Sequence, residues 1–92
     1  MIISLHRHFI DQVANQPPAI RAAVFDAILA LPQSLRNPTK HKGLGLRKLH
    51  ASGIWELRVG LGLRCLLQLA PDQAIFRFLG NHDEVRKYLR NL

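Results

Sequence analysis

Apolar residues in the first third of the chain recur at helical spacing. Phe9, Ile10 and Val13 predict a short helix, and Pro17-Pro18 interrupts it. Pro18 can occupy the first turn of a following helix, which a second apolar stripe predicts. That stripe consists of Ile20, Val24, Ala27, Ile28 and Leu31. Each helix has one apolar side, so we expect a helical hairpin that packs against another layer.

The ends of this hairpin are marked by other signals. Ile3 and Leu5 alternate with polar residues, which permits a short strand within residues 2–8. The second helix is expected to end at Leu31, because Pro32 disfavours helical backbone in the residue before it. Residues 33–53 contain one proline and three glycines and are interpreted as a loop. A loop of roughly 20 residues in a compact domain suggests a function.

Three segments of the second half alternate with the period of a strand: 55–59, 64–69 and 75–78. Short turns separate them, so they predict an antiparallel meander. One set of positions is expected to face the helices: Trp55, Leu57, Val59, Cys65, Leu67, Leu69, Phe76 and Phe78. The other set is expected on the opposite face: Glu56, Arg58, Arg64, Leu66, Gln68, Ile75 and Arg77.

The C-terminal segment predicts a last helix. Asn81 is suited to cap its start, with Glu84 three residues later as in a capping box. Its apolar stripe consists of Val85, Tyr88, Leu89 and Leu92. The fold class expected for residues 1–92 is therefore α+β in a single domain. An N-terminal helical hairpin, with or without a short first strand, packs on a small antiparallel β-meander that a C-terminal helix follows.

The charge of the chain predicts a polyanionic partner. Thirteen Lys and Arg stand against six Asp and Glu, for a formal charge of +7. Nucleic acid is the first candidate, an acidic protein the second and an anionic membrane surface the third. No apolar run approaches the ~20 residues that span a bilayer, and the first residues lack the order of a signal peptide. The single cysteine, Cys65, excludes an intrachain disulfide, so we expect a cytoplasmic protein.

Cationic residues gather in the predicted loop and on one face of the predicted sheet. The loop has five Lys or Arg and no acid. Together with the sheet arginines it would line a groove that attracts phosphates, with strongly salt-dependent binding. The residues expected to contact RNA or a ribosome are Lys40, Lys42, Arg47, Lys48, His50 and Arg77. The alternative is a solvated loop and solvated arginines, with Glu56 as an ion-pair partner.

His82 stands at the start of the last helix, where its imidazole can reach the open face of the sheet. Cleaving RNA without a metal needs a group that takes the 2′-hydroxyl proton and one that protonates the 5′-oxygen. It also needs cations beside the phosphoryl group. His82 with Arg58 and Arg64 provides part of this set, and His50 or a loop lysine is the candidate for the rest. The alternative is an exposed residue at a helix start.

Three stretches resemble the C-terminal half of toxins of the RelE/ParE superfamily: residues 55–60 (Trp-Glu-Leu-Arg-Val-Gly), Leu63-Arg64 and residues 78–85 (Phe-Leu-Gly-Asn-His-Asp-Glu-Val). The resemblance implies the toxin of a type II toxin–antitoxin pair that an antitoxin wraps and blocks. The RelE branch cleaves mRNA in the ribosomal A site without a metal, so no cofactor is expected. The ParE branch inhibits DNA gyrase. The implied partners are the antitoxin, mRNA and the ribosome, with DNA contacted only through the antitoxin complex.

The resemblance also implies site residues. His82 matches the catalytic histidine that YafQ-type members have in a Gly-x-His-x-Glu stretch, and Arg58 falls where RelE-type members have a catalytic arginine. Arg64 matches the arginine of the family's Tyr-Arg pair, although Leu63 replaces the tyrosine. The catalytic set implied is thus His82, Arg58 and Arg64.

Two departures keep other functions open. Arg58 and Gly62 stand where YafQ-type members have an added His and Asp, and the C-terminal tyrosine of RelE has no secure match. Tyr88 lies on an apolar stripe and is expected to be buried. The function favoured is a messenger-RNA endonuclease. The alternatives are a gyrase inhibitor and a non-toxic protein that only binds its antitoxin. His6 and His8 would share one side of a strand, which is a weak indication of a metal site.

Overall fold

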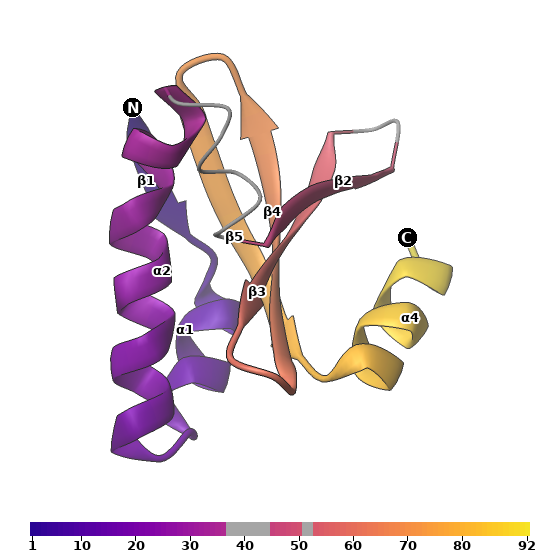
Figure 1. The fold of residues 1–92 in the computed structure, drawn as a ribbon. Helices are drawn as coiled ribbons and strands as arrows, with labels where there is room; N and C mark the ends of the chain where they lie inside the picture. The colour runs from indigo at the N-terminus through magenta and orange to yellow at the C-terminus, as the bar shows by residue number, and fades with distance from the viewer. Residues whose placement is uncertain (37–44, 51–52) are drawn as a thin grey trace.

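The computed structural model describes residues 1–36, 45–50 and 53–92, and it shows two helical layers on opposite faces of one sheet (Figure 1). The elements in chain order are β1 (Ile2–Leu5), α1 (Arg7–Ala14), α2 (Pro18–Arg36), β2 (Leu46–His50), β3 (Ile54–Val59), β4 (Leu63–Ala70), β5 (Gln73–Gly80) and α4 (His82–Arg90). The hairpin of α1 and α2 covers one face and α4 covers part of the other. The predicted α+β fold is confirmed.

The sheet has five strands in the order β1-β5-β4-β3-β2. Its centre is the predicted antiparallel meander of β3, β4 and β5. Two strands extend it at the edges: β1 pairs with β5 in parallel, and β2 pairs with β3 antiparallel. The short first strand that the alternation of Ile3 and Leu5 permits is therefore present.

The predicted end of the second helix at Leu31 is wrong, because α2 continues to Arg36 with Pro32 inside it. A proline within a helix removes one backbone hydrogen bond and strains the preceding turn. Packing on both sides of Pro32 offsets that cost. Leu31 is fully buried and Ser34 is 5% exposed, while Leu35 packs against the main core. Tertiary contacts therefore prevail over the local signal.

The prediction of a loop over residues 33–53 is also wrong in part, because residues 46–50 form β2. Leu46 lies opposite Leu57 and is 7% exposed, so this strand has its own place in the core. Gly45 directly precedes β2 and Gly53 directly precedes β3, with φ of 71° and 88°, values that favour glycine. Two of the glycines that indicate a loop thus stand directly before strands.

The main core lies between the helical hairpin and the sheet. Its fully buried side chains include Phe9, Val24, Leu31, Leu57, Cys65, Leu67 and Phe76. Cys65 is a core residue as predicted, and burial raises the pKa of its thiol to about 12. Trp55 is only partly buried and packs at the edge of this core.

A β-bulge in β5 reverses the predicted side of Phe78. Leu66 pairs with Phe78 and Leu67 with Phe76, so Arg77 is the extra residue on its strand. Phe76 therefore faces the main core, whereas Phe78 faces α4 and stacks on Tyr88 with ring centroids 4.5 Å apart. The expectation that both phenylalanines face the helical hairpin is wrong for Phe78.

A second, smaller core holds α4 to the sheet. It is formed by Ile54, Leu66 and Val85, with Leu49, Phe78, Tyr88 and Leu89 packed around it. Tyr88 is thus half-buried, as its place on the apolar stripe suggests, but Leu92 lies beyond the end of α4 and is 63% exposed. Among the helices that the structure describes, none combines the length and the apolar character needed to cross a membrane.

Candidate functional site

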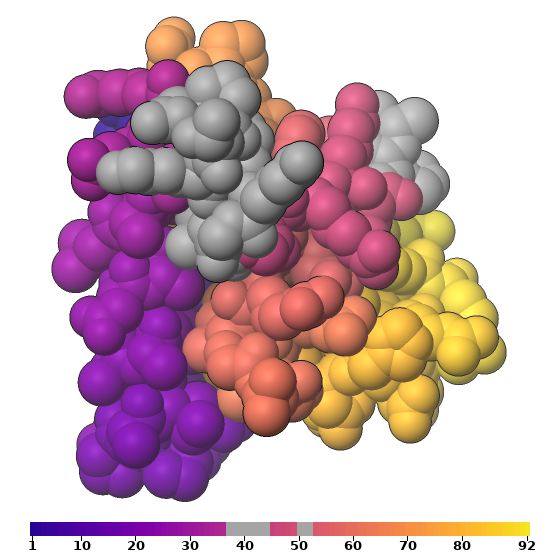
Figure 2. All heavy atoms as spheres, in the orientation of Figure 1, coloured from indigo at the N-terminus to yellow at the C-terminus, as the bar shows by residue number. Residues whose placement is uncertain are grey.

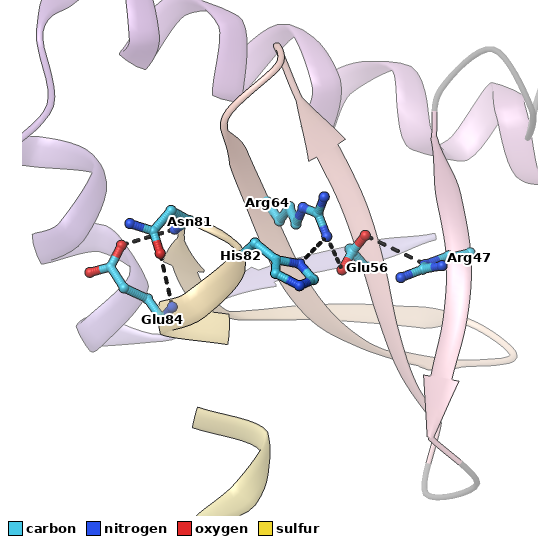
Figure 3. Close-up of polar contacts among 6 residues, drawn as sticks. All are labelled: Arg47, Glu56, Arg64, Asn81, His82 and Glu84. Carbon is cyan, nitrogen blue, oxygen red and sulfur yellow. Dashed lines mark hydrogen bonds and ion pairs between the residues drawn. The ribbon is translucent and has the colours of Figure 1, made fainter. Parts of the chain in front are cut away.

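Four polar side chains from four different elements form one connected chain on the α4 face of the sheet (Figure 3). Arg47 Nε lies 3.5 Å from Glu56 Oε1, and Arg64 NH1 lies 3.4 Å from Glu56 Oε2. The same NH1 atom lies 2.9 Å from Nδ1 of His82. The chain therefore runs from β2 through β3 and β4 to the start of α4.

The start of α4 places His82 beside Arg64. Gly80 lies directly opposite Arg64 in the β4–β5 ladder, and His82 is the first residue of the helix. The predicted capping box is confirmed: the Glu84 backbone N–H donates to Asn81 Oδ1, and the Asn81 backbone N–H donates to Glu84 Oε1, both at 2.9 Å. These two bonds fix the first turn and therefore the position from which the imidazole extends.

Arg58 is the third predicted catalytic residue, and the structure places it next to Arg64. The two arginines are directly opposite each other on β3 and β4, and Arg58 is exposed. Side chains in such pairs project on the same face with Cβ atoms about 5 Å apart, and like charges there are destabilising. This end of the sheet lies between the helical hairpin and α4 in the space-filling view (Figure 2). An anion bound here would relieve the repulsion.

The predicted RNA-contact residues are distributed over several places. Arg47 joins the chain through Glu56, but Lys48 lies opposite Trp55, on the other face of the sheet. Arg77 donates to Gln68 Oε1 at 3.2 Å. Gln68 lies four positions after Arg64 on β4, which separates the two residues by about 13 Å along the strand. Lys40, Lys42 and the His50 side chain lie outside the described residues.

The two N-terminal histidines do not share a side of a strand, contrary to the expectation. The first strand ends at Leu5, His6 occupies the N-cap position of α1, and His8 lies within that helix. The His8 ring lies near Phe78, with centroids 6.0 Å apart. Within the part of the chain that the structure describes, no three His, Cys, Asp or Glu side chains gather as a metal-binding group.

Comparisons with known proteins bear on the backbone arrangement. No protein-family model and no curated protein matches the chain. A chain of the RelB–RelE antitoxin–toxin complex from Methanococcus jannaschii matches with a TM-score of 0.66 and 17% identity, over 92% of this chain and 96% of that one. YafQ from E. coli strain BL21(DE3) matches with a TM-score of 0.61 and 17% identity, over 90% and 94%. The chain has the RelE-like fold.

A third solved structure to which the chain is similar is that of a conserved hypothetical protein from Helicobacter pylori. It covers 92% of this chain and 98% of its own length, at a TM-score of 0.50 and 17% identity. All three likenesses cover at least nine-tenths of this chain. At such low identity they concern the path of the backbone, so the roles of individual residues depend on the geometry of this chain.

Glu56 belongs to the site, but the sequence alone does not indicate a functional role for it. It is 2% exposed, the only buried charged residue in the described part of this chain. The alternation does place it on the face of Arg58 and Arg64, and the possibility of an ion pair follows from that. Nothing in the sequence indicates that one carboxylate contacts two arginines, because Arg47 comes from a strand interpreted as a loop.

The hydrogen bond between Arg64 and His82 shows which ring nitrogen faces the guanidinium. A guanidinium has donors only, so Nδ1 of His82 must be the acceptor and carry no proton. In this contact Nε2 is the ring nitrogen left to carry a proton. The guanidinium can instead donate to a phosphate oxygen, with which it forms stronger charge-assisted bonds. In the RelE-like fold of this chain, Arg64 is thus placed to exchange the imidazole for an anion.

Proposed function

We propose that this protein is the toxin of a type II toxin–antitoxin pair, acting as an mRNA endoribonuclease on the ribosome and neutralised by a cognate antitoxin. The observation that carries the proposal is the contact of Arg64 with His82, next to Arg58, at one end of the sheet of a RelE-like fold. The similarity to a chain of the RelB–RelE complex and to YafQ supports the toxin and the antitoxin partner.

The reaction that fits the site is a transesterification within the RNA strand. The 2′-oxygen forms a bond to phosphorus while the bond from phosphorus to the 5′-oxygen breaks. The products are a 2′,3′-cyclic phosphate end and a 5′-hydroxyl end. Arg58 and Arg64 stabilise the negative charge that develops on the phosphoryl oxygens. No metal or cofactor enters this scheme.

His82 transfers one of the two protons. In the free protein Nδ1 is occupied by the Arg64 guanidinium. When the scissile phosphate takes over that guanidinium, Nδ1 becomes free to accept the proton of the 2′-hydroxyl. Binding of the phosphate therefore makes the base available where it is needed. A second group protonates the departing 5′-oxygen.

The remaining cations would guide the RNA and the ribosome. The net charge of +7 favours a polyanion at long range, and Arg47 extends the site to the edge of the sheet. We assign this role to Lys40, Lys42, Arg47, Lys48, His50 and Arg77. Arg47 and Lys48 lie on opposite faces of β2, so these contacts would wrap the edge of the sheet.

Induction in bacteria with mapping of transcript ends tests the proposal. The unaltered protein and Arg90→Ala, which removes an exposed arginine at the opposite end of α4 from His82, are expected to arrest growth and to create new transcript ends. His82→Ala and Arg58→Ala are expected to lose both effects. Full toxicity and cleavage in both site variants would contradict the assignment. DNA-damage signalling without new ends would indicate gyrase inhibition, and harmless expression a protein that only binds its antitoxin.

A further inference from the structure

Glu56 is an unusual residue for the middle of a strand. It lies between Trp55 and Leu57, and its side chain is 3% exposed. An ionised carboxylate loses its hydration when it is buried, and the ion pairs it gains do not reliably repay that loss. An apolar residue of similar size is often at least as good for stability at such a position. Stability alone therefore does not account for the carboxylate.

The two oxygens of Glu56 divide its interactions between two strands. Oε1 faces Arg47 on β2 and Oε2 faces Arg64 on β4, at 3.5 and 3.4 Å (Figure 3). The partners differ in their freedom, because the side chain of Arg47 is 64% exposed and that of Arg64 only 19%. The carboxylate thus holds one arginine that is largely confined and one that remains accessible to solvent.

Arg64 needs such a partner to remain where it is. It lies directly opposite Arg58, and the repulsion between the two guanidinium groups favours their separation. The imidazole of His82 provides no negative charge to compensate for it. Glu56 is the carboxylate that contacts Arg64, and the same NH1 atom serves Glu56 and His82. The position of the guanidinium beside the imidazole thus depends on the charge of Glu56.

We propose that Glu56 is a positioning residue: its buried carboxylate holds the Arg64 guanidinium against Nδ1 of His82 and thereby selects the Nε2–H form of that imidazole. The consequence for RNA cleavage rests on the proposed function. A phosphate bound by Arg64 then arrives next to the nitrogen that must take the proton. Without the carboxylate, Arg64 turns away from Arg58 and from His82, and the phosphate is bound outside the reach of the imidazole.

Glu56→Gln tests this role, because it removes the charge and keeps the shape. The matched control is Asp83→Asn, which removes an exposed carboxylate from the residue next to His82. Nitrogen NMR of the histidine rings, with His82 assigned by its loss in His82→Ala, reports which ring nitrogen carries the proton. The unaltered protein and the control are expected to show a single Nε2–H form. Glu56→Gln is expected to show a mixture of both forms at an unchanged melting temperature.

The cleavage assay gives a second, separate result. A displacement of Arg64 by about 1 Å is expected to lower kcat on the order of 10²-fold in Glu56→Gln, whereas Asp83→Asn keeps full activity. A single Nε2–H form in Glu56→Gln would overturn the proposal whatever the activity. A mixture of forms in a protein that cleaves no RNA would support the positioning role and contradict the proposed function.

A second variant covers the case in which Glu56→Gln does not fold. Glu56→Asp keeps the buried charge and draws the carboxylate back by one methylene group, away from Arg64. It is expected to fold and to show a partial loss of the single Nε2–H form. If the His82 ring in Glu56→Asp is the same as in the unaltered protein, the distance from the carboxylate to Arg64 does not matter and the proposal fails.

Discussion

Gly80 of β5 lies directly opposite Arg64 of β4, and the absence of a side chain there lets α4 begin immediately after the strand. A Cβ atom at Gly80 would lie 2.8 Å from Cε2 of Phe78 and 2.9 Å from Cβ of Glu84. Both contacts are too short for carbon atoms. The closeness of His82 to Arg64 therefore depends on a glycine that has no polar role of its own.

Gly80→Ala is expected to displace the first turn of α4 and to lower the free energy of unfolding by about 1–3 kcal/mol, the usual cost of an overpacked site. Urea denaturation measures this loss. Gly62→Ala is the control, because nothing lies within 4 Å of a Cβ there and its φ is not positive. We expect the control to stay within about 0.5 kcal/mol. Equal stability of the two variants would show that α4 tolerates the displacement.

Asn81→Ala removes the side-chain acceptor of the capping box. We expect a loss of about 1 kcal/mol in the free energy of unfolding, as for other capping residues. The first turn of α4 should also exchange its amide hydrogens faster, which hydrogen-exchange NMR measures at Glu84. Asn91→Ala, at the other end of the same helix, is the comparison. A change at Glu84 no larger than in Asn91→Ala would mean that the capping box does not hold this turn.

Some parts of the candidate site can be predicted from the sequence and others cannot. Alternation in β3 and β4 places Glu56, Arg58 and Arg64 on one face, and the structure agrees because both strands are regular. The capping signal at Asn81 is local and equally reliable. These features predict a shared cationic face with His82 at its end, although the roles of these residues remain proposals.

Other features depend on contacts between distant segments. β2 has cations at two of its five positions, so its strand character comes from pairing with β3. Pro32 remains in α2 because residues on either side of it are buried. The bulge at Arg77 leaves the apolar pattern of β5 intact, and only the pairing with Leu66 and Leu67 reveals it. Local sequence propensity cannot predict these three features, because the contacts that stabilise them come from a partner strand or from the packed layer.

The salt dependence of RNA binding distinguishes phosphate contacts from solvated arginines. Each lost contact to a single strand reduces the slope of log K against log salt concentration by about 0.7. We expect this reduction for Arg58→Ala and for Arg64→Ala, measured by fluorescence anisotropy with a short single-stranded RNA. Arg90→Ala should retain the slope of the unaltered protein. If all four proteins show the same slope, Arg58 and Arg64 are solvated arginines that do not contact phosphate.

The thiol of Cys65 should be unreactive in the folded protein. Burial raises its pKa from 9.0 to about 12, so the folded thiol stays neutral where the thiol of the unfolded chain ionises. This contribution to stability is complete below pH 9.0 and is lost as the pH rises toward 12. Between pH 8 and pH 10 we expect the free energy of unfolding to fall by about 1 kcal/mol more than in Cys65→Ala. Urea denaturation at the two pH values measures the difference, and labelling by a thiol reagent at pH 8 should require unfolding. Rapid labelling of the native protein, or the same pH dependence in both proteins, would show that the thiol is accessible and ionises in the folded state.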